Sequence, residues 1–316
     1  MDRVLVTPRS VTQHGHPSLR RLAAAGYEVA LGPPGRQPTE AELLDVIPGC
    51  VGYIAGVEPV SARVLMSASK LRAISRNGTG TDNIDAATAA SRGIAVLRAE
   101  GANARGVAEL TFALIFALVR DLSQTDAALK RDQWVRRQGI ELEGRTLGLI
   151  GCGRVGRIVA SIAGALGMKV LASDPLAEGK FQPGDFFRFG PVNEIFRQAE
   201  VISLHCPPVP DGRPILDRDA LASSRRGVFV VNTARFDLID PAAMLGGLDS
   251  GHVAGLGLDV FAEEPPKDTT LARHSRVIAT SHLGGFTQES VERAMDAAVD
   301  NLLRALAVPH AKREVS

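Results

Sequence analysis

Three glycines, Gly151, Gly153 and Gly156, form the pattern Gly-x-Gly-x-x-Gly in the segment GCGRVG. The apolar run TLGLI at 146–150 precedes this segment, and the helix-like run RIVASIAGALG follows it. Between a strand and a helix, the first glycine permits a tight turn, the second lets the backbone approach a pyrophosphate, and the third lets the helix pack on the strand. The helix N-terminus is then aimed at the phosphates. The pattern therefore indicates a dinucleotide-binding turn.

A carboxylate follows the next predicted strand. Asp174 comes directly after VLAS at 170–173, about 20 residues beyond the glycines, where it can accept hydrogen bonds from the adenosine ribose hydroxyls. The next four residues, PLAE, include no cation that could neutralise a 2′-phosphate. A glycine-rich turn alone is weak evidence of nucleotide binding. Together with Asp174 it predicts a bound cofactor, and favours NAD over NADP.

The elements that must hold these residues follow an α/β rhythm. Short apolar runs alternate with helix-length segments throughout the chain, which is typical of parallel sheets covered by helices. The predicted strands are VLVT at 4–7, VGYIAG at 51–56, LRAIS at 71–75, TLGLI, VLAS, VISL at 201–204 and VFVVN at 228–232. A long helical pattern from about Asn103 to Arg120 and the polar segment 121–143 lie between the two groups of strands, and we expect the domain connection there.

The composition is that of a globular protein with room for two domains. The chain has 316 residues, of which 45% are hydrophobic and 22% charged, and its net charge is +1. Because basic residues are not in excess, we expect no nucleic-acid partner. The apolar segment 107–119 is shorter than the ~20 residues that span a bilayer and contains Glu109, so no membrane span is expected. Cys50, Cys152 and Cys206 lack the spacing of zinc ligands, so we expect no metal and a reducing, cytoplasmic location.

Several further segments resemble the D-isomer-specific 2-hydroxyacid dehydrogenases, most closely their phosphoglycerate dehydrogenase branch. In the family's order, they are RNGTGTDNID at 76–85, GANARGVAELTFAL at 101–114, GCGRVG, HCPPVP at 205–210, VNTAR at 231–235, GLDVFAEEPP at 257–266 and TSHLGG at 280–285. The resemblance implies two doubly wound parallel α/β domains. Residues 1–98 and 286–316 would form the substrate domain, and residues 99–285 a Rossmann NAD-binding domain inserted into it. The reaction would take place in the cleft between them.

The same resemblance assigns three catalytic residues: Arg235, Glu264 and His282. Reduction of a 2-oxo acid needs a hydride donor, a proton donor at the carbonyl oxygen, and a cation that holds the carboxylate. The planar fork of arginine suits a carboxylate, so Arg235 would bind it. A histidine beside a carboxylate can donate a proton in reduction and accept one in oxidation, so Glu264 would tune His282 as the acid and base.

The resemblance also implies which residues bind the cofactor and the substrate. For substrate these are the backbone around Asn77 and Gly78, with Arg235, and we add Arg76 because it lies beside this loop. For NAD they are Thr79, Gly151, Gly153, Arg154, Val155, Gly156, Asp174, Cys206, Pro207, Thr233, Ala234, Arg235, Asp259, His282, Gly284 and Gly285. The family further implies a homodimer through the long helix and the following arm, and Trp134 on that arm is interpreted as an interface anchor.

Three questions stay open at this stage. The family usually has glycine where Phe236 stands, and Phe286 also departs from its pattern, so the substrate is the least defined feature. Arg98 and Arg105, with Arg76, either converge on a second anionic group of the substrate or pair with nearby acids. The expected activity is hydride transfer between NAD and C2 of a small 2-hydroxy or 2-oxo acid. The alternatives are D-3-phosphoglycerate dehydrogenase proper and a non-catalytic, NADH-sensing protein like the corepressors that resemble this family.

Overall fold

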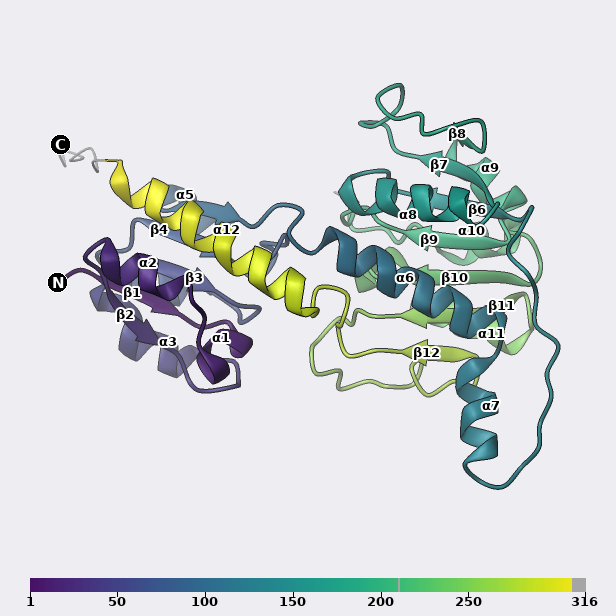
Figure 1. The fold of residues 1–316 in the computed structure, drawn as a ribbon, viewed down its shortest axis with the longest axis horizontal. Coiled ribbons are helices and arrows are strands. Elements are labelled where there is room, and N and C mark those ends of the chain that lie inside the picture. Colours follow the sequence, from purple (N-terminus) through teal and green to yellow (C-terminus); the bar gives the residue numbers. More distant parts are fainter. Residues whose placement is uncertain (210, 309–316) are drawn as a thin grey trace. The chain divides into compact units, whose positions relative to one another are not determined.

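The computed structural model describes residues 1–209 and 211–308, and divides the chain into two units (Figure 1). Unit 1 comprises Met1–Asn103 and Thr287–Ser316, and unit 2 comprises Ala104–Phe286. The sequence places the first division after residue 98, but residues 99–103 are tied to unit 1. The amide of Ala99 donates to the Gly78 carbonyl (3.0 Å), and the Thr79 hydroxyl donates to Asn103 Oδ1 (3.1 Å). The domain connection was expected between about Asn103 and residue 143, and the division falls at the start of that region, so α6 and the polar segment 121–143 lie within unit 2.

Unit 1 is built on a five-stranded parallel sheet. Its order is β2-β1-β3-β4-β5, so the direction of winding reverses between β1 and β3. The strands are β1 (Arg3–Val6), β2 (Glu28–Leu31), β3 (Cys50–Ala55), β4 (Ala73–Arg76) and β5 (Ala95–Arg98). Ligands of such sheets bind beyond the carboxyl ends of the strands, near the point of reversal.

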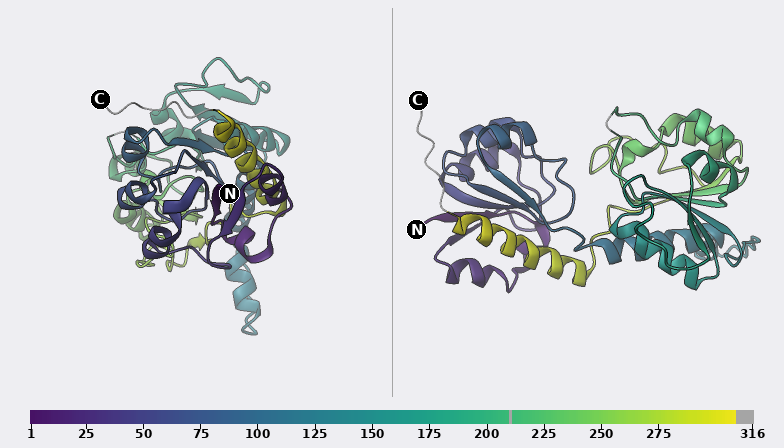
Figure 2. Two further views of the ribbon diagram at one scale, coloured as in Figure 1. Left: turned by 90° about the vertical axis from the view of Figure 1, so that its left-hand side faces the viewer. Right: turned by 90° about the horizontal axis from the view of Figure 1, so that it is seen from above.

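Helices cover both faces of the unit 1 sheet (Figure 2). One face packs against α1 (Arg9–His14), α2 (Leu19–Ala24) and α12 (Gln288–Ala307), and the other against α3 (Glu40–Val46), α4 (Ala62–Ser67), α5 (Ala86–Ser91) and the 3-10 turn η1 (Ile47–Gly49). The buried stripe of α12 includes Met295, Val299, Leu302 and Leu306 at helical spacing. A Cβ on Gly52 of β3 would lie 3.0–3.2 Å from the methyl groups of Leu302 and Leu306, so this glycine lets α12 lie close to the sheet.

Unit 2 contains a seven-stranded parallel sheet of order β12-β11-β10-β9-β6-β7-β8. Its strands are β6 (Thr146–Ile150), β7 (Lys169–Ser173), β8 (Phe187–Phe189), β9 (Val201–Leu204), β10 (Val228–Asn232), β11 (Val253–Leu258) and β12 (Val277–Ala279). The winding reverses between β6 and β9, and the glycine-rich turn follows β6 at this point. Two parallel α/β domains, the second a Rossmann domain within the first, were predicted, and this fold class is confirmed.

The helices of unit 2 also form two layers. The first contains α6 (Ala104–Val119) and α8 (Arg154–Ala165), and the second contains α9 (Val192–Gln198), α10 (Arg218–Ser223) and α11 (Pro241–Asp249). The remaining helix, α7 (Leu122–Leu129), projects away from the sheet of unit 2 with the segment that follows it (Figure 1). A 3-10 turn, η2 (Phe236–Leu238), follows β10. These layers leave the carboxyl ends of the strands to the loops that carry the predicted site residues.

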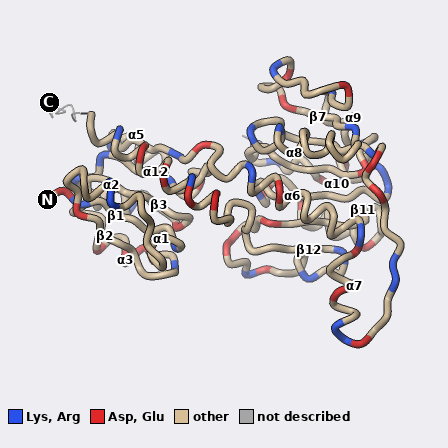
Figure 3. Tube along the Cα trace, viewed as in Figure 1, with Lys and Arg blue, Asp and Glu red and all other residues tan. Residues whose placement is uncertain are grey.

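Basic and acidic residues are interspersed along both units (Figure 3). Among the described residues, no helix combines the length and the apolar character needed to cross a bilayer. The three cysteines are free thiols.

Candidate active site

The glycine-rich turn between β6 and α8 places a different steric demand on each glycine. Gly151 has a φ of 96°, and a Cβ there would lie 2.5 Å from the backbone carbonyl of His205. A Cβ on Gly156 would lie 2.2 Å from the Gly151 carbonyl oxygen. In contrast, a Cβ on Gly153 would meet no atom within 4 Å. The open space at Gly153, at the N-terminus of α8, suits the close approach of a pyrophosphate.

The carboxylate of Asp174 lies beside this turn, at the end of β7. Its Oδ2 accepts a hydrogen bond from the amide of Cys152 (2.8 Å), and its Oδ1 accepts from the amides of Leu176 (2.8 Å) and Ala177 (3.1 Å). These bonds hold the carboxylate over the glycine-rich turn. Because a carboxylate offers about four acceptor positions, Asp174 can still accept a bond from a ribose hydroxyl.

Nearly all the other residues predicted to bind the cofactor lie at the carboxyl edge of the unit 2 sheet. Arg154 and Val155 form the first turn of α8, Cys206 and Pro207 follow β9, Thr233 and Ala234 follow β10, Asp259 follows β11, and His282, Gly284 and Gly285 follow β12. Pro210, the last residue of the HCPPVP segment, lies outside the described residues. Thr79 is the exception, because it belongs to unit 1.

His205, to which the sequence analysis gave no role, lies directly behind the glycine-rich turn. Its amide donates to the Ile150 carbonyl (2.7 Å), and its Nε2 lies 2.8 Å from the hydroxyl of the buried Ser203. Burial lowers the pKa of His205 to about 3, so the imidazole is neutral. His205 therefore supports the turn as an uncharged residue. Its position directly after a buried strand was the available sequence signal.

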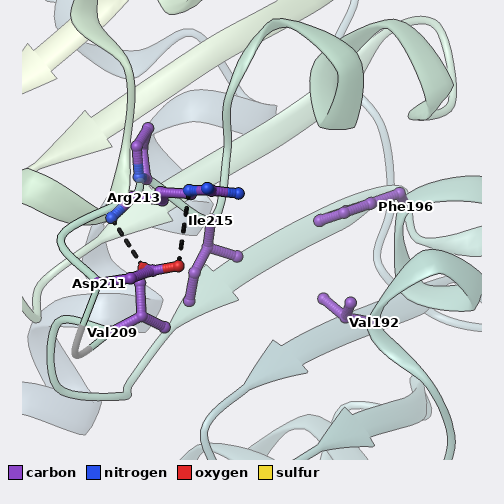
Figure 4. Close-up of a pocket in the computed structure, with 7 residues that line it drawn as sticks. Val192, Phe196, Val209, Asp211, Arg213 and Ile215 are labelled. Carbon is purple, nitrogen blue, oxygen red and sulfur yellow. Dashed lines mark hydrogen bonds and ion pairs between the residues drawn. The ribbon is translucent and has the colours of Figure 1, made fainter.

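A pocket of about 550 Å³ opens at the same edge of unit 2 (Figure 4). It is lined by Val192, Phe196, Val209, Asp211, Arg213, Pro214 and Ile215. Its polar rim is an ion pair, in which Arg213 Nε lies 3.6 Å from Asp211 Oδ2. One wall is formed by α9. Gly190, two residues before this helix, donates its amide to the Ala172 carbonyl of β7 (2.9 Å). That wall is therefore close to the strand that carries Asp174. The sequence analysis did not identify this pocket.

The backbone at Arg235 is fixed by a buried asparagine. Asn232, the last residue of β10, donates through Nδ2 to the Arg235 carbonyl (2.7 Å) and accepts at Oδ1 from the Ala234 amide (3.1 Å). The Arg235 guanidinium donates to the Ala234 carbonyl (2.7 Å). Phe236, which departs from the family pattern, packs against the core of unit 2 and begins η2. It therefore supports this turn from the core side.

Glu264 and His282, far apart in sequence, form a close pair. Nδ1 of His282 lies 2.7 Å and 2.9 Å from the two carboxylate oxygens of Glu264. Burial raises the pKa of Glu264. The hydrogen bond and charge of His282, the hydrogen bond from the Phe261 amide and, least, the charge of Arg235 together outweigh burial, so the pKa lies below its ordinary value. Arg235 is thus close enough to act electrostatically on the pair. The three predicted catalytic residues gather in unit 2.

The loop that carries His282 is held by Asp259, which is 1% exposed. Asp259 Oδ1 accepts from the Thr280 hydroxyl (2.6 Å) and the Leu283 amide (2.7 Å), and Oδ2 accepts from the Gly284 amide (2.8 Å). His282 has a φ of 56°, a left-handed conformation that is uncommon for residues other than glycine. The bonds on both sides of His282 maintain this conformation and direct its ring toward Glu264.

The predicted substrate residues of unit 1 have different roles. The amide of Asn77 donates within the sheet to the Ala55 carbonyl (2.9 Å), so it is occupied. Within the described residues, no hydrogen bond occupies the amides of Gly78 and Thr79. Successive unoccupied amides of this kind can bind an anion. Arg76 is 9% exposed and lies behind this loop rather than on its open side, as described below.

The arginines considered for a second anionic group pair with their own neighbours. Arg98 Nη2 lies 2.9 Å from Glu100 Oε1, and Arg105 Nε lies 2.5 Å from Glu109 Oε1. The pairing interpretation is therefore the one found in the structure. Among the described residues, no group of three or more histidine, cysteine, aspartate or glutamate side chains could hold a metal ion.

Taken together, a Rossmann unit with a dinucleotide turn and an Arg, Glu and His cluster at one sheet edge defines the class of nucleotide-dependent dehydrogenases. The family model described as D-isomer specific 2-hydroxyacid dehydrogenase, NAD binding domain, matches residues 112–284. The chain belongs to the D-isomer specific 2-hydroxyacid dehydrogenases, a family of NAD-dependent oxidoreductases.

Relatives and solved structures are consistent with this family. The chain is 38% identical to human D-3-phosphoglycerate dehydrogenase over 258 residues, which cover 81% of this chain and 48% of that protein. It therefore spans about half the length of the curated relatives it matches. A Thermus thermophilus protein of known structure is 34% identical, with a TM-score of 0.85 over 96% of both chains. The Aquifex aeolicus D-lactate dehydrogenase, solved with NAD and lactic acid, is 26% identical, with a TM-score of 0.80 over 96% of this chain and 95% of that one.

Proposed function

We propose that the protein is a D-2-hydroxyacid dehydrogenase that uses NAD to interconvert a small 2-hydroxy acid and its 2-oxo acid. The observation that carries the proposal is the pairing of His282 Nδ1 with Glu264, 2.7 Å apart, in the unit that also holds Arg235 and the dinucleotide turn. His282 is itself exposed, and what distinguishes this pair is that Asp259 holds the loop on both sides of the histidine. With a dinucleotide turn on the same sheet edge, the cluster fits hydride transfer to a carbonyl carbon.

The geometry supports a separate role for each side chain. Because Glu264 occupies Nδ1 of His282, the opposite nitrogen, Nε2, is the one directed to donate a proton to the carbonyl oxygen of a 2-oxo acid. In the reverse direction, Nε2 accepts the hydroxyl proton. The Arg235 guanidinium matches the planar shape of a carboxylate, and holds the acid so that C2 is presented. In unit 1, the unoccupied amides of Gly78 and Thr79 can donate hydrogen bonds to a carboxylate.

The residues of unit 2 fit NAD. The open space at Gly153 takes the pyrophosphate, Asp174 accepts from the ribose, and the apolar floor of the pocket at Val192 and Phe196 suits the adenine ring. When bound, the cofactor supplies or accepts the hydride at C2. Because Asp174 would repel a 2′-phosphate, NADH is the preferred form.

The experiment that tests this function measures NADH oxidation with a panel of 2-oxo acids, and NAD⁺ reduction with the matching D-2-hydroxy acids and D-3-phosphoglycerate. We expect activity with at least one acid, and a rate reduced roughly 10²- to 10⁴-fold in His282→Ala. Arg235→Ala should raise KM as well as lower the rate. Full activity of folded His282→Ala would refute the mechanism.

Two narrower functions are distinguished by the same panel. D-3-phosphoglycerate dehydrogenase is favoured by the 38% identity to proteins of that name. The pairing of Arg98 with Glu100 and of Arg105 with Glu109 does not favour a doubly charged substrate. An NADH-sensing binding protein would bind NADH and turn over none of the acids.

We propose in addition that the protein is a homodimer joined through α6 and the arm that follows it. Large apolar side chains gather there in exposed positions, and Trp134 is 82% exposed. The others are Phe116, Leu122, Leu129 and Val135. Water-exposed apolar groups of this number mark association surfaces. Light scattering should give the mass of a dimer for the wild type and of a monomer for Leu129→Ser with Trp134→Ala. A monomeric wild type would refute the proposal.

Three free thiols also fit the proposed cytoplasmic location, which fractionation of cells would test.

A further inference from the structure

Arg76 ends β4 immediately before the loop with unoccupied amides, but its guanidinium is bonded on the inner side of that loop. Nη1 donates to the Asn77 carbonyl (2.9 Å), and Nε donates to Asn83 Oδ1 (3.3 Å). A Cβ on Gly78 would lie 2.9 Å from the same Nη1, so the guanidinium lies against the back of Gly78. With 9% of its surface exposed, Arg76 is a support beneath the loop.

Asn83 connects this support to a second loop of unit 1. Its Nδ2 donates to the carbonyls of Glu58 (2.6 Å) and Gly56 (3.3 Å), both in the loop after β3. The loops that follow two neighbouring strands, β3 and β4, are therefore joined through one side chain. The four side-chain hydrogen bonds described here join residues of unit 1.

The loop after β3 is in turn anchored by the buried carboxylate of Glu58, which is 1% exposed. Glu58 Oε1 accepts from the Tyr53 hydroxyl (2.6 Å), the Gly56 amide (2.9 Å) and the Thr7 hydroxyl. Thr7 directly follows β1, so the network reaches the strand at which the winding of the sheet reverses. A buried network whose members are satisfied is rigid. Arg76 thus links the 77–79 loop to a fixed base.

We propose that Arg76 is a positioning residue for substrate. It holds the Asn77 carbonyl turned inward, and the amides of Gly78 and Thr79 are thereby kept on the open side of the loop, where they receive the carboxylate. This inference rests on the proposed function for the identity of the anion, but the support itself is a property of unit 1. Arg76 acts through the loop and touches no reacting atom.

The first test compares Arg76→Ala with Arg92→Ala. Arg92 is a matched control, because its guanidinium also donates to backbone carbonyls of unit 1, those of Leu65, Met66 and Ala68, at a site away from the 77–79 loop. We expect Arg76→Ala to raise KM for the 2-oxo acid up to about 10²-fold, with a smaller change in kcat and no change in NADH affinity. Millimolar guanidinium chloride should restore KM in Arg76→Ala alone. Arg76→Lys should rescue poorly, because an ammonium cannot reproduce the planar fork.

The second test does not depend on turnover. Amide hydrogen exchange of Asn77, which donates to the Ala55 carbonyl, and of Ala99, which donates to the Gly78 carbonyl, should become faster in Arg76→Ala and in Asn83→Ala, and stay at the wild-type rate in Arg92→Ala. Asn83 is half-buried, so Asn83→Ala tests the support even if Arg76→Ala does not fold. If the wild type turns over no 2-oxo acid, the proposed function fails while exchange still reports on the support. Wild-type KM and wild-type exchange in folded Arg76→Ala would overturn the inference, as would an equal rise of KM in Arg92→Ala.

Discussion

Replacing Asp259 with asparagine should destabilise unit 2 and slow turnover together. The asparagine oxygen can still accept from Thr280 and Leu283, but its amide group would face the Gly284 N–H, donor against donor. Gly284 is buried, so its amide would lose its partner without gaining water, which costs about 1–3 kcal/mol. The two remaining bonds lose their charge assistance, at roughly 1 kcal/mol each. The expected destabilisation is therefore about 3–5 kcal/mol.

This loss can be measured as a melting temperature. A domain of 150–250 residues shifts by about 2–4 °C per kcal/mol, so Asp259→Asn should melt roughly 6–20 °C lower. Since the left-handed His282 is held through its two following amides, we also expect kcat to fall about 10²-fold. Asp240→Asn is the control, because Asp240 accepts from two amides at the start of α11 and asparagine caps helices equally well.

The comparison also separates two roles of Asp259. If it contacts the nicotinamide carboxamide, as the family resemblance implies, NADH affinity should fall in Asp259→Asn. If it acts only by holding the loop, NADH affinity should stay near the wild-type value while kcat and stability fall. A variant that melts within 2 °C of the wild type, roughly 1 kcal/mol or less, and keeps its kcat would refute the role assigned to Asp259.

Three further predictions concern the same unit. Gly153→Ala should keep wild-type stability but bind NADH at least roughly tenfold more weakly, as measured by NADH fluorescence. Gly156→Ala should instead lower the free energy of unfolding by about 1–3 kcal/mol, as measured by thermal melts, since its Cβ would lie 2.2 Å from a carbonyl oxygen. Asp174→Ala should narrow the preference for NADH, measured as a ratio of kcat/KM values, and a wild type that prefers NADPH contradicts this. Because the folded pKa of Glu264 lies below its ordinary value of 4.5, its pairing with His282 stabilises the protein above about pH 4.5 and is lost as pH falls through the lower folded pKa. Urea unfolding should show that the free energy of unfolding of Glu264→Gln lacks this decrease between pH 7 and 3. If the variant and the wild type depend on pH in the same way, Glu264 and His282 do not form a stabilising pair.

Features encoded over a few neighbouring residues could be predicted from the sequence. The runs at 146–150, 201–204 and 228–232 coincide with β6, β9 and β10, because fully buried parallel strands are continuous apolar runs. The glycine-rich turn was predicted because each glycine meets a local steric demand. The short edge strand β8, Phe187–Phe189, was not predicted, since three residues are too few to show a periodicity.

Features that depend on contacts distant in sequence could not be derived from spacing. The pairing of Glu264 with His282 came only from the family resemblance, and it takes a loop held by Asp259 to bring them together. Arg76 was assigned to the substrate because it precedes the predicted loop. The direction of the Arg76 side chain depends on Asn83 and on a network anchored at Glu58. Nothing in the sequence distinguishes Glu58 from any other acidic residue in a loop.

The placement of α12 has a consequence for how the protein is made on the ribosome. All five strands of unit 1 leave the ribosome first, then the whole of unit 2, and only then the helix that covers Val4, Val6, Val51, Ile54 and Ala73. Until α12 arrives, this apolar face of the sheet is incompletely covered, while unit 2 is continuous in sequence and has hydrophobic clusters of its own. An apolar sheet face that waits for its last helix is prone to aggregation, and binding by a chaperone during this interval would protect the nascent chain.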